Sequence, residues 1–267
     1  MRSVIKIVIL QSHTGGNDMW NHLHKHWHKY GGIQLIVTYQ PNVTLDSLLH
    51  EDPDILVCSD PSGAPYQYTD QELSDIKTYV NQGHHILGTY LTFYHQEKST
   101  AIIYDNRQLC SLFGITTDQS YTRVELPKTI EYVPLVSSPL WKHVTTPYLS
   151  HGYNYSQYPV NNGWYDVLQP DTRVMGQSHD SKCVILNHVD IGFTSMYISH
   201  MAEYDSLSHS DDVQFLYNCF VYLNQQKRLP SLTTLCMRKI ARHPRKFRNL
   251  SCLPVELIDD LSKLKVK

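Results

Sequence analysis

Several chemically capable side chains stand at the ends of predicted strands in this 267-residue chain. Cys58 ends one apolar run, at the position where α/β proteins place ligands. His188, Asp190, His200 and Glu203 follow two later runs and could line the same crevice. Imidazole and carboxylate groups at such a place are candidates for general acid–base chemistry. Two interpretations stay open: a polar pocket, or ordinary hydrogen bonding at strand ends with Cys58 as a buried structural thiol.

Two pairs of histidines share the faces of one predicted helix. His22 and His26, like His24 and His28, are four residues apart, which is a spacing that suits metal ligation. A metal site needs further ligands, and no third acidic or cysteine ligand stands nearby. We therefore predict no metal site, and we expect no cofactor.

Strand and helix signals alternate through the first hundred residues. Thr69 and Glu72 form a capping box that opens a helix, and Gly83 closes it. Strands that alternate with helices need crossover connections, so we predict a doubly wound, flavodoxin-like α/β fold with a mostly parallel sheet. The expected strands are 3–10, 33–39, 54–58 and 84–88, and the expected helices are 18–30, 45–49 and 69–81.

The regular alternation stops between residues 120 and 175. Prolines and a dense aromatic stretch from Tyr148 to Tyr165 predict hairpins and an insertion over the sheet. Regularity returns with expected strands at 183–187 and 194–199 and an amphipathic helix that begins at Asp211.

Composition and charge divide the chain into two modules. The sequence is 41% hydrophobic, 18% charged and 11% aromatic, which is a globular composition. Residues 1–226 hold 12 Lys/Arg and 22 Asp/Glu, a net charge of −10, whereas residues 227–267 hold 11 and 3, a net charge of +8. We therefore predict domains at 1–226 and 227–267.

Cysteine usage and hydropathy predict the compartment. The six cysteines form no CxxC pair, and no apolar run is long enough to cross a bilayer. We therefore expect a protein of the cytoplasm, with the nucleus as a second compartment, that does not contact a membrane.

Three segments resemble class I glutamine amidotransferases. Residues 54–65, DILVCSDPSGAP, resemble the strand that ends in the family's oxyanion loop, and residues 83–93, GHHILGTYLTF, resemble the strand that enters the nucleophile elbow. Residues 195–203, SMYISHMAE, are similar to the strand that carries the family's His-Pro-Glu. Residues 211–223 resemble the closing helix of the related ThuA-like and biotin-ligase N-terminal-like proteins. The resemblance spans residues 1–226 and implies the amidotransferase-like fold.

At the positions that match the family's catalytic residues, this sequence departs from the family pattern in three ways. The nucleophile position is Tyr90, and a phenol with a reference pKa near 10 is a poor nucleophile. His200 and Glu203 are three residues apart instead of two, and the loop 59–65 keeps only Gly63. We therefore predict a pseudoenzyme without glutaminase activity, in which Tyr90, His200 and Glu203 are degenerate positions.

The C-terminal segment resembles a SOCS box. Ser231 is a good N-cap and Pro244 stops the helix, so the apolar residues between them form one narrow stripe. This stripe resembles the elongin BC box, and a later segment resembles the cullin-contacting Leu-Pro segment, although Glu256 replaces a proline common in cullin-recruiting members. The implied elongin-binding residues are Leu232, Leu235, Cys236 and Ile240, and the implied cullin-contacting residues are Leu253, Pro254 and Val255.

Together these patterns predict a non-catalytic substrate-recognition subunit of an elongin B/C–cullin ubiquitin ligase. Aromatic residues concentrate binding energy at interfaces, so we predict that an unidentified protein client binds the aromatic insertion. The alternative is a small-molecule binder or unusual hydrolase that uses the crevice near Tyr90, with a structural tail. Basic residues of the tail fit a solvated helix face better than a nucleic-acid patch. The candidate client surface is Tyr148, Tyr153, Tyr155, Tyr158, Trp164 and Tyr165.

Overall fold

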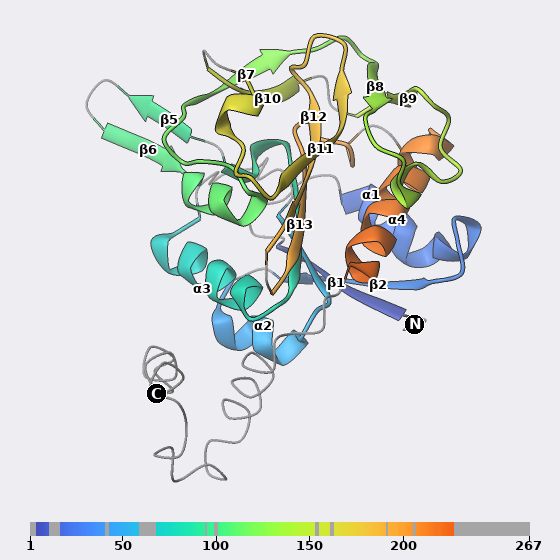
Figure 1. Ribbon diagram of the computed structural model, residues 1–267. Helices are drawn as coiled ribbons and strands as arrows, with labels where there is room; N and C mark the ends of the chain where they lie inside the picture. The colour runs from blue at the N-terminus through green and yellow to red at the C-terminus, as the bar shows by residue number, and fades with distance from the viewer. Residues whose placement is uncertain are drawn as a thin grey trace. The chain divides into compact units, whose positions relative to one another are not determined.

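The alternation of strands and helices produces a layered α/β arrangement in the computed structural model (Figure 1). The chain divides into the units Met1–Lys227 and Arg228–Lys267. All described residues belong to the first unit. They are 4–10, 17–40, 43–58, 68–93, 95–98, 101–152, 155–160, 163–190, 192–204 and 207–226.

Nine strands of the described residues form one sheet. In spatial order they are β2 (Gln34–Gln40), β1 (Val4–Leu10), β3 (Ile55–Cys58), β4 (His85–Thr89), β13 (Thr194–Ile198), β12 (Val184–Val189), β11 (Thr172–Ser178), β8 (Ile130–Pro134) and β9 (Tyr148–Ser150). The prediction of a parallel sheet holds from β2 to β13, whereas every later pairing is antiparallel. Only residues 190–193 join β12 to β13, which is too short for the crossover that parallel neighbours need.

Helices cover both faces of the parallel half, as a doubly wound fold requires. The α-helices of the described residues are α1 (Asn17–His26), α2 (Leu45–Glu51), α3 (Asp70–Asn81) and α4 (Ser210–Gln225). One buried cluster joins α1 and α4 to Ile7 and Val57, while a second cluster joins α2 and α3 to Val8 and Leu56 (Figure 1). Successive residues of a strand point to opposite faces, so each strand contributes to both clusters.

Local sequence signals explain where the elements begin and end. Thr69 accepts the backbone N–H of Glu72, and Glu72 accepts that of Thr69, which confirms the capping box at α3. Gly83, just beyond α3, has a φ of 100°. The helix expected at 18–30 ends instead at His26 and continues as the short 3₁₀ turn η2 (Trp27–Lys29).

The prediction of hairpins and an insertion over residues 120–175 is only partly right, because β8, β9 and the first residues of β11 belong to the main sheet, while two small ribbons lie outside it. Among the described residues, β7 (Tyr121–Glu125) pairs with β10 (Tyr155–Pro159), and β5 (His95–Lys98) pairs with β6 (Ala101–Asp105). The 3₁₀ turns there are η3 (Tyr90–Phe93), η4 (Arg107–Phe113), η5 (Pro139–Trp141) and η6 (Tyr165–Val167). None of the helices in the described part has the length and apolar character needed to span a lipid bilayer.

Candidate functional site

The turn from β4 into η3 has the backbone of an elbow. Tyr90, the first residue after β4, has a φ of 43°, in the left-handed region that non-glycine residues rarely adopt. Position 88, two residues before Tyr90, requires a glycine because a Cβ there would lie only 2.7 Å from the Phe113 ring. The Tyr197 hydroxyl donates a 2.8 Å hydrogen bond to the Tyr90 carbonyl. A strained strand-to-helix turn is therefore present where the sequence predicts one.

The side chain on this elbow lies in the protein interior. Tyr90 is 1% exposed and packs in a small cluster with Leu91 and Met201, over which Tyr155 lies half-buried. The Arg123 guanidinium lies over the Tyr155 ring, 3.7 Å from the centroid. Aromatic and aliphatic groups thus occupy the position from which a nucleophile would have to reach a substrate.

Cys58, which ends the neighbouring strand β3, is also an unreactive group. Burial raises the pKa of its thiol to about 12, and the thiolate is the nucleophilic form. Its carbonyl accepts a 2.7 Å hydrogen bond from Thr92 Oγ1, which ties the end of β3 to the turn after β4. The buried structural thiol is the interpretation that these contacts favour.

His200 lies just after β13 but uses both ring nitrogens inside the protein. Nδ1 lies 2.5 Å from the Tyr132 hydroxyl and Nε2 lies 2.6 Å from Ser150 Oγ. Burial lowers the pKa of His200 to about 3, so the ring is neutral near pH 7. A neutral imidazole with both nitrogens engaged by β8 and β9 is a poor general base for chemistry at Tyr90.

Glu203 is buried in the same turn and contacts a different strand. Its Oε1 accepts a 2.6 Å hydrogen bond from Thr89 Oγ1, the last residue of β4. Since the ring nitrogens of His200 are bound to Tyr132 and Ser150, the structure does not align His200 and Glu203 as an orienting pair. The spacing of three residues between His200 and Glu203, instead of two, therefore goes with side chains that bond to different strands.

His188 and Asp190 belong to the opposite end of the sheet, which corrects the prediction of a shared crevice. β12 runs antiparallel to β13, and His188 pairs with Ser195 near the start of β13. Its ring Nδ1 lies 3.1 Å from Thr172 Oγ1, and burial lowers its pKa. Ordinary hydrogen bonding at a strand end accounts for His188.

The predicted client surface is divided between interior and exterior. Tyr148 and Trp164 are buried, with their polar atoms bonded to Asp212 and to the Lys182 carbonyl, so they are core residues and not a surface. Tyr165 is 57% exposed. Tyr155 and Tyr158 are half-buried on β10. Tyr153 lies outside the described residues, as do the loop 59–65 and the predicted partner-binding residues Leu232, Leu235, Cys236, Ile240, Leu253, Pro254 and Val255.

An open groove of about 710 Å³ lies between the end of β8 and η5, and the sequence had not predicted it. Val133 and Leu135 are each 44% exposed beside it, and Glu131 and Lys142 contribute its charges. The available signal was the alternation along β8, where Ile130 and Tyr132 are buried and Val133 falls on the outward phase.

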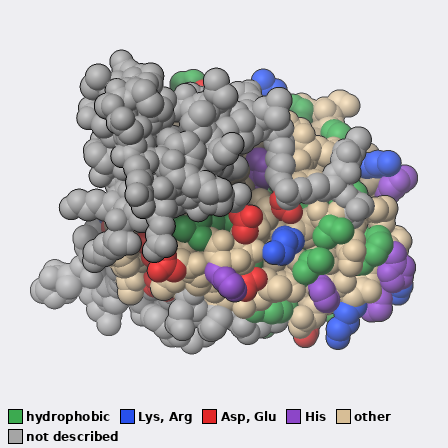
Figure 2. Space-filling model, turned by 90° about the horizontal axis from the view of Figure 1, so that it is seen from below, with side chains coloured by type: hydrophobic (Ala, Val, Ile, Leu, Met, Phe, Trp, Pro, Cys, Tyr) green, Lys and Arg blue, Asp and Glu red, His purple; other side chains and the backbone are tan. Residues whose placement is uncertain are grey.

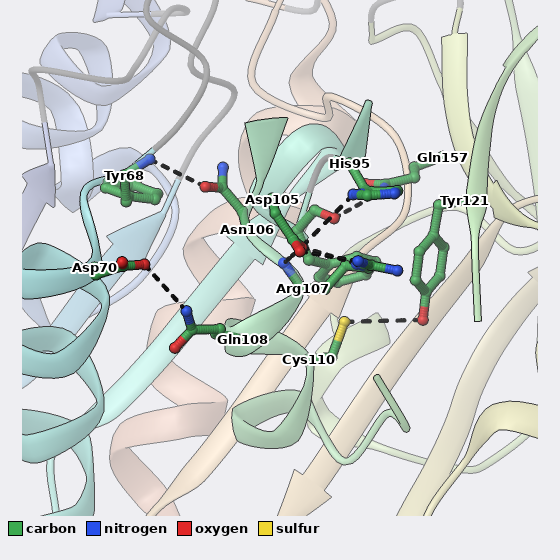
Figure 3. Close-up of polar contacts among 11 residues, drawn as sticks. Tyr68, Asp70, His95, Asp105, Asn106, Arg107, Gln108, Cys110, Tyr121 and Gln157 are labelled. Atoms are coloured by element: carbon green, nitrogen blue, oxygen red, sulfur yellow. Dashed lines mark hydrogen bonds and ion pairs between the residues drawn. The ribbon is translucent and has the colours of Figure 1, made fainter. Parts of the chain in front are cut away.

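A polar cluster at the start of η4 was also not predicted (Figure 3). The Arg107 guanidinium donates to both oxygens of Asp105, at 2.8 and 2.9 Å, and this bonding lowers the Asp105 pKa. Figure 3 shows His95 directed toward the same carboxylate, with Nδ1 3.7 Å from Oδ1. Buried Asn106 accepts the backbone N–H of Tyr68. These contacts join η4 to β6 and to the start of α3.

The rings of His22 and His26 lie together as their spacing predicts, with centroids 4.7 Å apart, and His22 and His24 also contact other residues. His22 Nε2 lies 2.7 Å from the Tyr30 hydroxyl, and His24 Nδ1 accepts the Val37 N–H at 3.1 Å. Histidines gather beside Lys and Arg at one margin of the face in Figure 2. The described residues contain no group of three or more His, Cys, Asp or Glu that could hold a metal ion.

Comparison with known proteins identifies the fold. No protein-family model and no curated protein matches the sequence. A putative ThuA-like protein from Bacteroides uniformis matches with a TM-score of 0.57 and 11% identity, over 84% of this chain and 92% of its own. Cytoplasmic protein STM1381 from Salmonella typhimurium gives 0.57 and 13%, over 84% and 100%. The mmIFT52 N-terminal domain gives 0.54 and 11%, over 84% and 100%.

These matches show the fold of the chain and do not assign a function to it. The chain has a ThuA-like α/β fold, so the amidotransferase-like resemblance of residues 1–226 is confirmed at the level of fold. Sequence identities of 11–13% carry no residue-level function across.

Proposed function

We propose that this chain is a non-catalytic substrate-recognition subunit of an elongin B/C–cullin ubiquitin ligase. In this proposal the α/β unit binds a protein client, and residues 227–267 bind elongin B/C through Leu232, Leu235, Cys236 and Ile240. Ubiquitin transfer is carried out by the recruited ligase, and the chain itself needs no cofactor.

The environment of the elbow is the observation that supports a non-catalytic role. Tyr90 is a buried phenol, and His200 is neutral with both ring nitrogens bound to Tyr132 and Ser150. A hydrolase of this fold would need an exposed nucleophile and an oriented base at these two positions. The small-molecule or hydrolase alternative has no comparable support among the described contacts.

The ligase half of the proposal rests on the C-terminal sequence. The stripe of Leu232, Cys236 and Ile240, the caps Ser231 and Pro244, and the later Leu-Pro segment occur in the order of a SOCS box. An amphipathic helix that inserts an apolar stripe into a partner groove is a common recognition mode.

Co-elution of the full chain with purified elongin B/C tests the proposal. The wild type should form a complex, and changing Leu232 and Cys236 together to glutamine should weaken it about a thousandfold, because two anchors contribute roughly 2 kcal/mol each. Leu49→Gln, at an exposed leucine of α2, is the matched control and should bind normally.

Two outcomes would contradict the proposal. A double variant that still co-elutes would show that these residues are not the anchors. A wild type that ignores elongin B/C would remove the ligase function and leave the alternative, in which the crevice near Tyr90 binds a small molecule.

A further inference from the structure

Two imidazole rings on α1 lie at the separation expected of two ligands of one metal ion. His22 and His26 are one helical turn apart, and their ring centroids are 4.7 Å apart with an interplanar angle of 49°. Metal–nitrogen bonds of about 2.0–2.1 Å place each ring centre about 3.2 Å from the ion, so two ligating rings at about 90–110° lie about 4.5–5.2 Å apart. The observed separation falls within that range.

The first ring is held in place by a residue outside the pair. His22 Nε2 lies 2.7 Å from the Tyr30 hydroxyl, and the Tyr30 ring contacts Tyr217 of α4, with centroids 6.3 Å apart. Metal-binding histidines commonly donate the N–H of one ring nitrogen to an oxygen while the other nitrogen binds the ion. The bond to Tyr30 is a contact of this kind, so Nδ1 of His22 is the candidate ligand atom.

The second ring is not used by a hydrogen bond. Within the part of the chain that the structure describes, the His26 ring contacts the rings of His22 and His28, and His26 makes no side-chain cap bond to η2. His22 and His26 are both partly exposed, so an ion and its water molecules can reach them from solvent. Partial burial, together with neighbouring positive charges, lowers the pKa of both rings, which favours the neutral imidazole that binds metal.

Water has to supply the remaining ligands of such an ion. The described residues offer no group of three His, Cys, Asp or Glu that could hold a metal, and the lack of a third ligand is why the sequence predicts no site here. Two imidazoles still form a chelate, and the late first-row metal ions accept imidazole. Lys25 and Lys29 oppose a bound dication, but salt screens charges at the surface, so they weaken the site without abolishing it.

We propose that His22 and His26 form a surface chelate for a divalent late transition-metal ion such as nickel(II), copper(II) or zinc(II). Both ligands belong to α1, and His26 is its last residue, so a bound ion ties the last turn of the helix to the turn before it. The ion therefore stabilises the end of α1, because it binds the helical conformation and not the frayed one. This site is independent of the proposed ligase function.

NMR of the histidine rings during a titration of the full chain with nickel(II) tests the site residue by residue. Nickel(II) is paramagnetic, so the ring signals of the histidines that bind it broaden first. The signals of His22 and His26 should respond at about tenfold lower nickel concentration than that of His50, an exposed histidine of α2 without a histidine one turn away. This measurement needs only the wild type.

Two variants identify the ligands. His26→Gln keeps the bond between His22 and Tyr30 but removes the chelate, so the nickel concentration that broadens His22 should rise about tenfold. His28→Gln, at an exposed histidine of η2, is the matched control and should behave like the wild type. The proposal is overturned if His22 and His26 respond no earlier than His50, or if His26→Gln leaves the response of His22 unchanged. A His28→Gln variant that weakens binding as much as His26→Gln also overturns it, because the ion would then lie between His26 and His28.

Discussion

Tyr90 combines a strained backbone with an ordinary buried side chain. A non-glycine residue at a φ of 43° costs about 1–2 kcal/mol unless its surroundings enforce the conformation. The surroundings here are the Tyr197 bond to its carbonyl and the close packing at Gly88. Backbone strain at an elbow is normally associated with a reactive group, and the buried phenol at this position is what the pseudoenzyme proposal rests on.

Restoring a thiol at the elbow should not restore glutaminase activity. Neither the wild type nor Tyr90→Cys should release ammonia from glutamine above the rate of a Tyr90→Phe control. The reason is that His200 remains neutral and bonded to Tyr132 and Ser150, so it cannot act as the base that activates the new thiol. Glutamine hydrolysis by the wild type that disappears on substitution at Tyr90 would contradict the pseudoenzyme proposal.

The neutral state of His200 predicts how stability depends on pH. Its pKa is lowered by burial from 6.5 to about 3, so between these values the unfolded chain binds a proton that the folded chain does not. Stability that is fully present above pH 6.5 is therefore lost as the pH falls, by about 2–3 kcal/mol between pH 7 and 4.5. Urea unfolding of the wild type and of His200→Gln should diverge by this amount.

Comparing the wild type with His200→Gln isolates the contribution of His200 to the pH dependence of stability. The other titratable groups are present in both proteins and cancel in the difference. If the two stability profiles run parallel from pH 7 to 4.5, then His200 is not held neutral in the folded protein.

At the scale of elements, the aromatic segment is divided by the strands that carry it. β9 pairs with β8 inside the main sheet, so Tyr148 points into the core, where its ring lies beside those of Phe215 and Trp141. β10 pairs with β7 in a separate two-stranded ribbon, and the short turn η6 presents Tyr165 to solvent. The ring type is the same in each case: Tyr148 is buried because its strand pairs inside the main sheet, whereas Tyr165 lies on a turn outside that sheet and is exposed.

Substitutions to alanine should separate these two kinds of tyrosine. Tyr148→Ala should lower the free energy of unfolding by about 3–5 kcal/mol, because it leaves a large cavity and removes a donor from buried Asp212. Tyr165→Ala should change it by at most about 0.5 kcal/mol. Denaturant unfolding measures both.

The tyrosines outside the core test the client surface of the proposed ligase subunit. Tyr165→Ala, alone or with Tyr158→Ala, should keep the fold and lose specific partners in a proximity-labelling profile. A folded variant that keeps every partner would place client binding elsewhere, and the groove beside Val133 would be the next surface to vary.

At the scale of the whole molecule, the sheet is built from two halves with different connections. The parallel half uses helical crossovers, and these place helices on both faces and produce two buried clusters. In the antiparallel half, short connections join β11 to β12 and β12 to β13, and α4 and η5 pack on one face against Tyr132, Tyr148 and Ile185. The ends of β4 and β13 meet at the junction of the two halves, which is where Tyr90, His200 and Glu203 come together.

The sequence alone determined the elements of the parallel half. Runs of apolar β-branched residues, the capping box at Thr69 and the amphipathic pattern after Asp211 depend on neighbours within a few residues, so local patterns were sufficient. The position of the elbow at Tyr90 and the fold class followed from the resemblance to amidotransferases, not from these local patterns.

Only the tertiary structure decided which side chains meet. Asp212 and His151 are 61 residues apart and His200 and Tyr132 are 68 apart, and no local pattern encodes those contacts. The antiparallel direction of β12 moved His188 away from the site, and strand pairing buried Tyr148 while leaving Tyr165 exposed. Burial and partner choice depend on how strands from distant parts of the chain pair, and this pairing also decided that His200 became a neutral core residue.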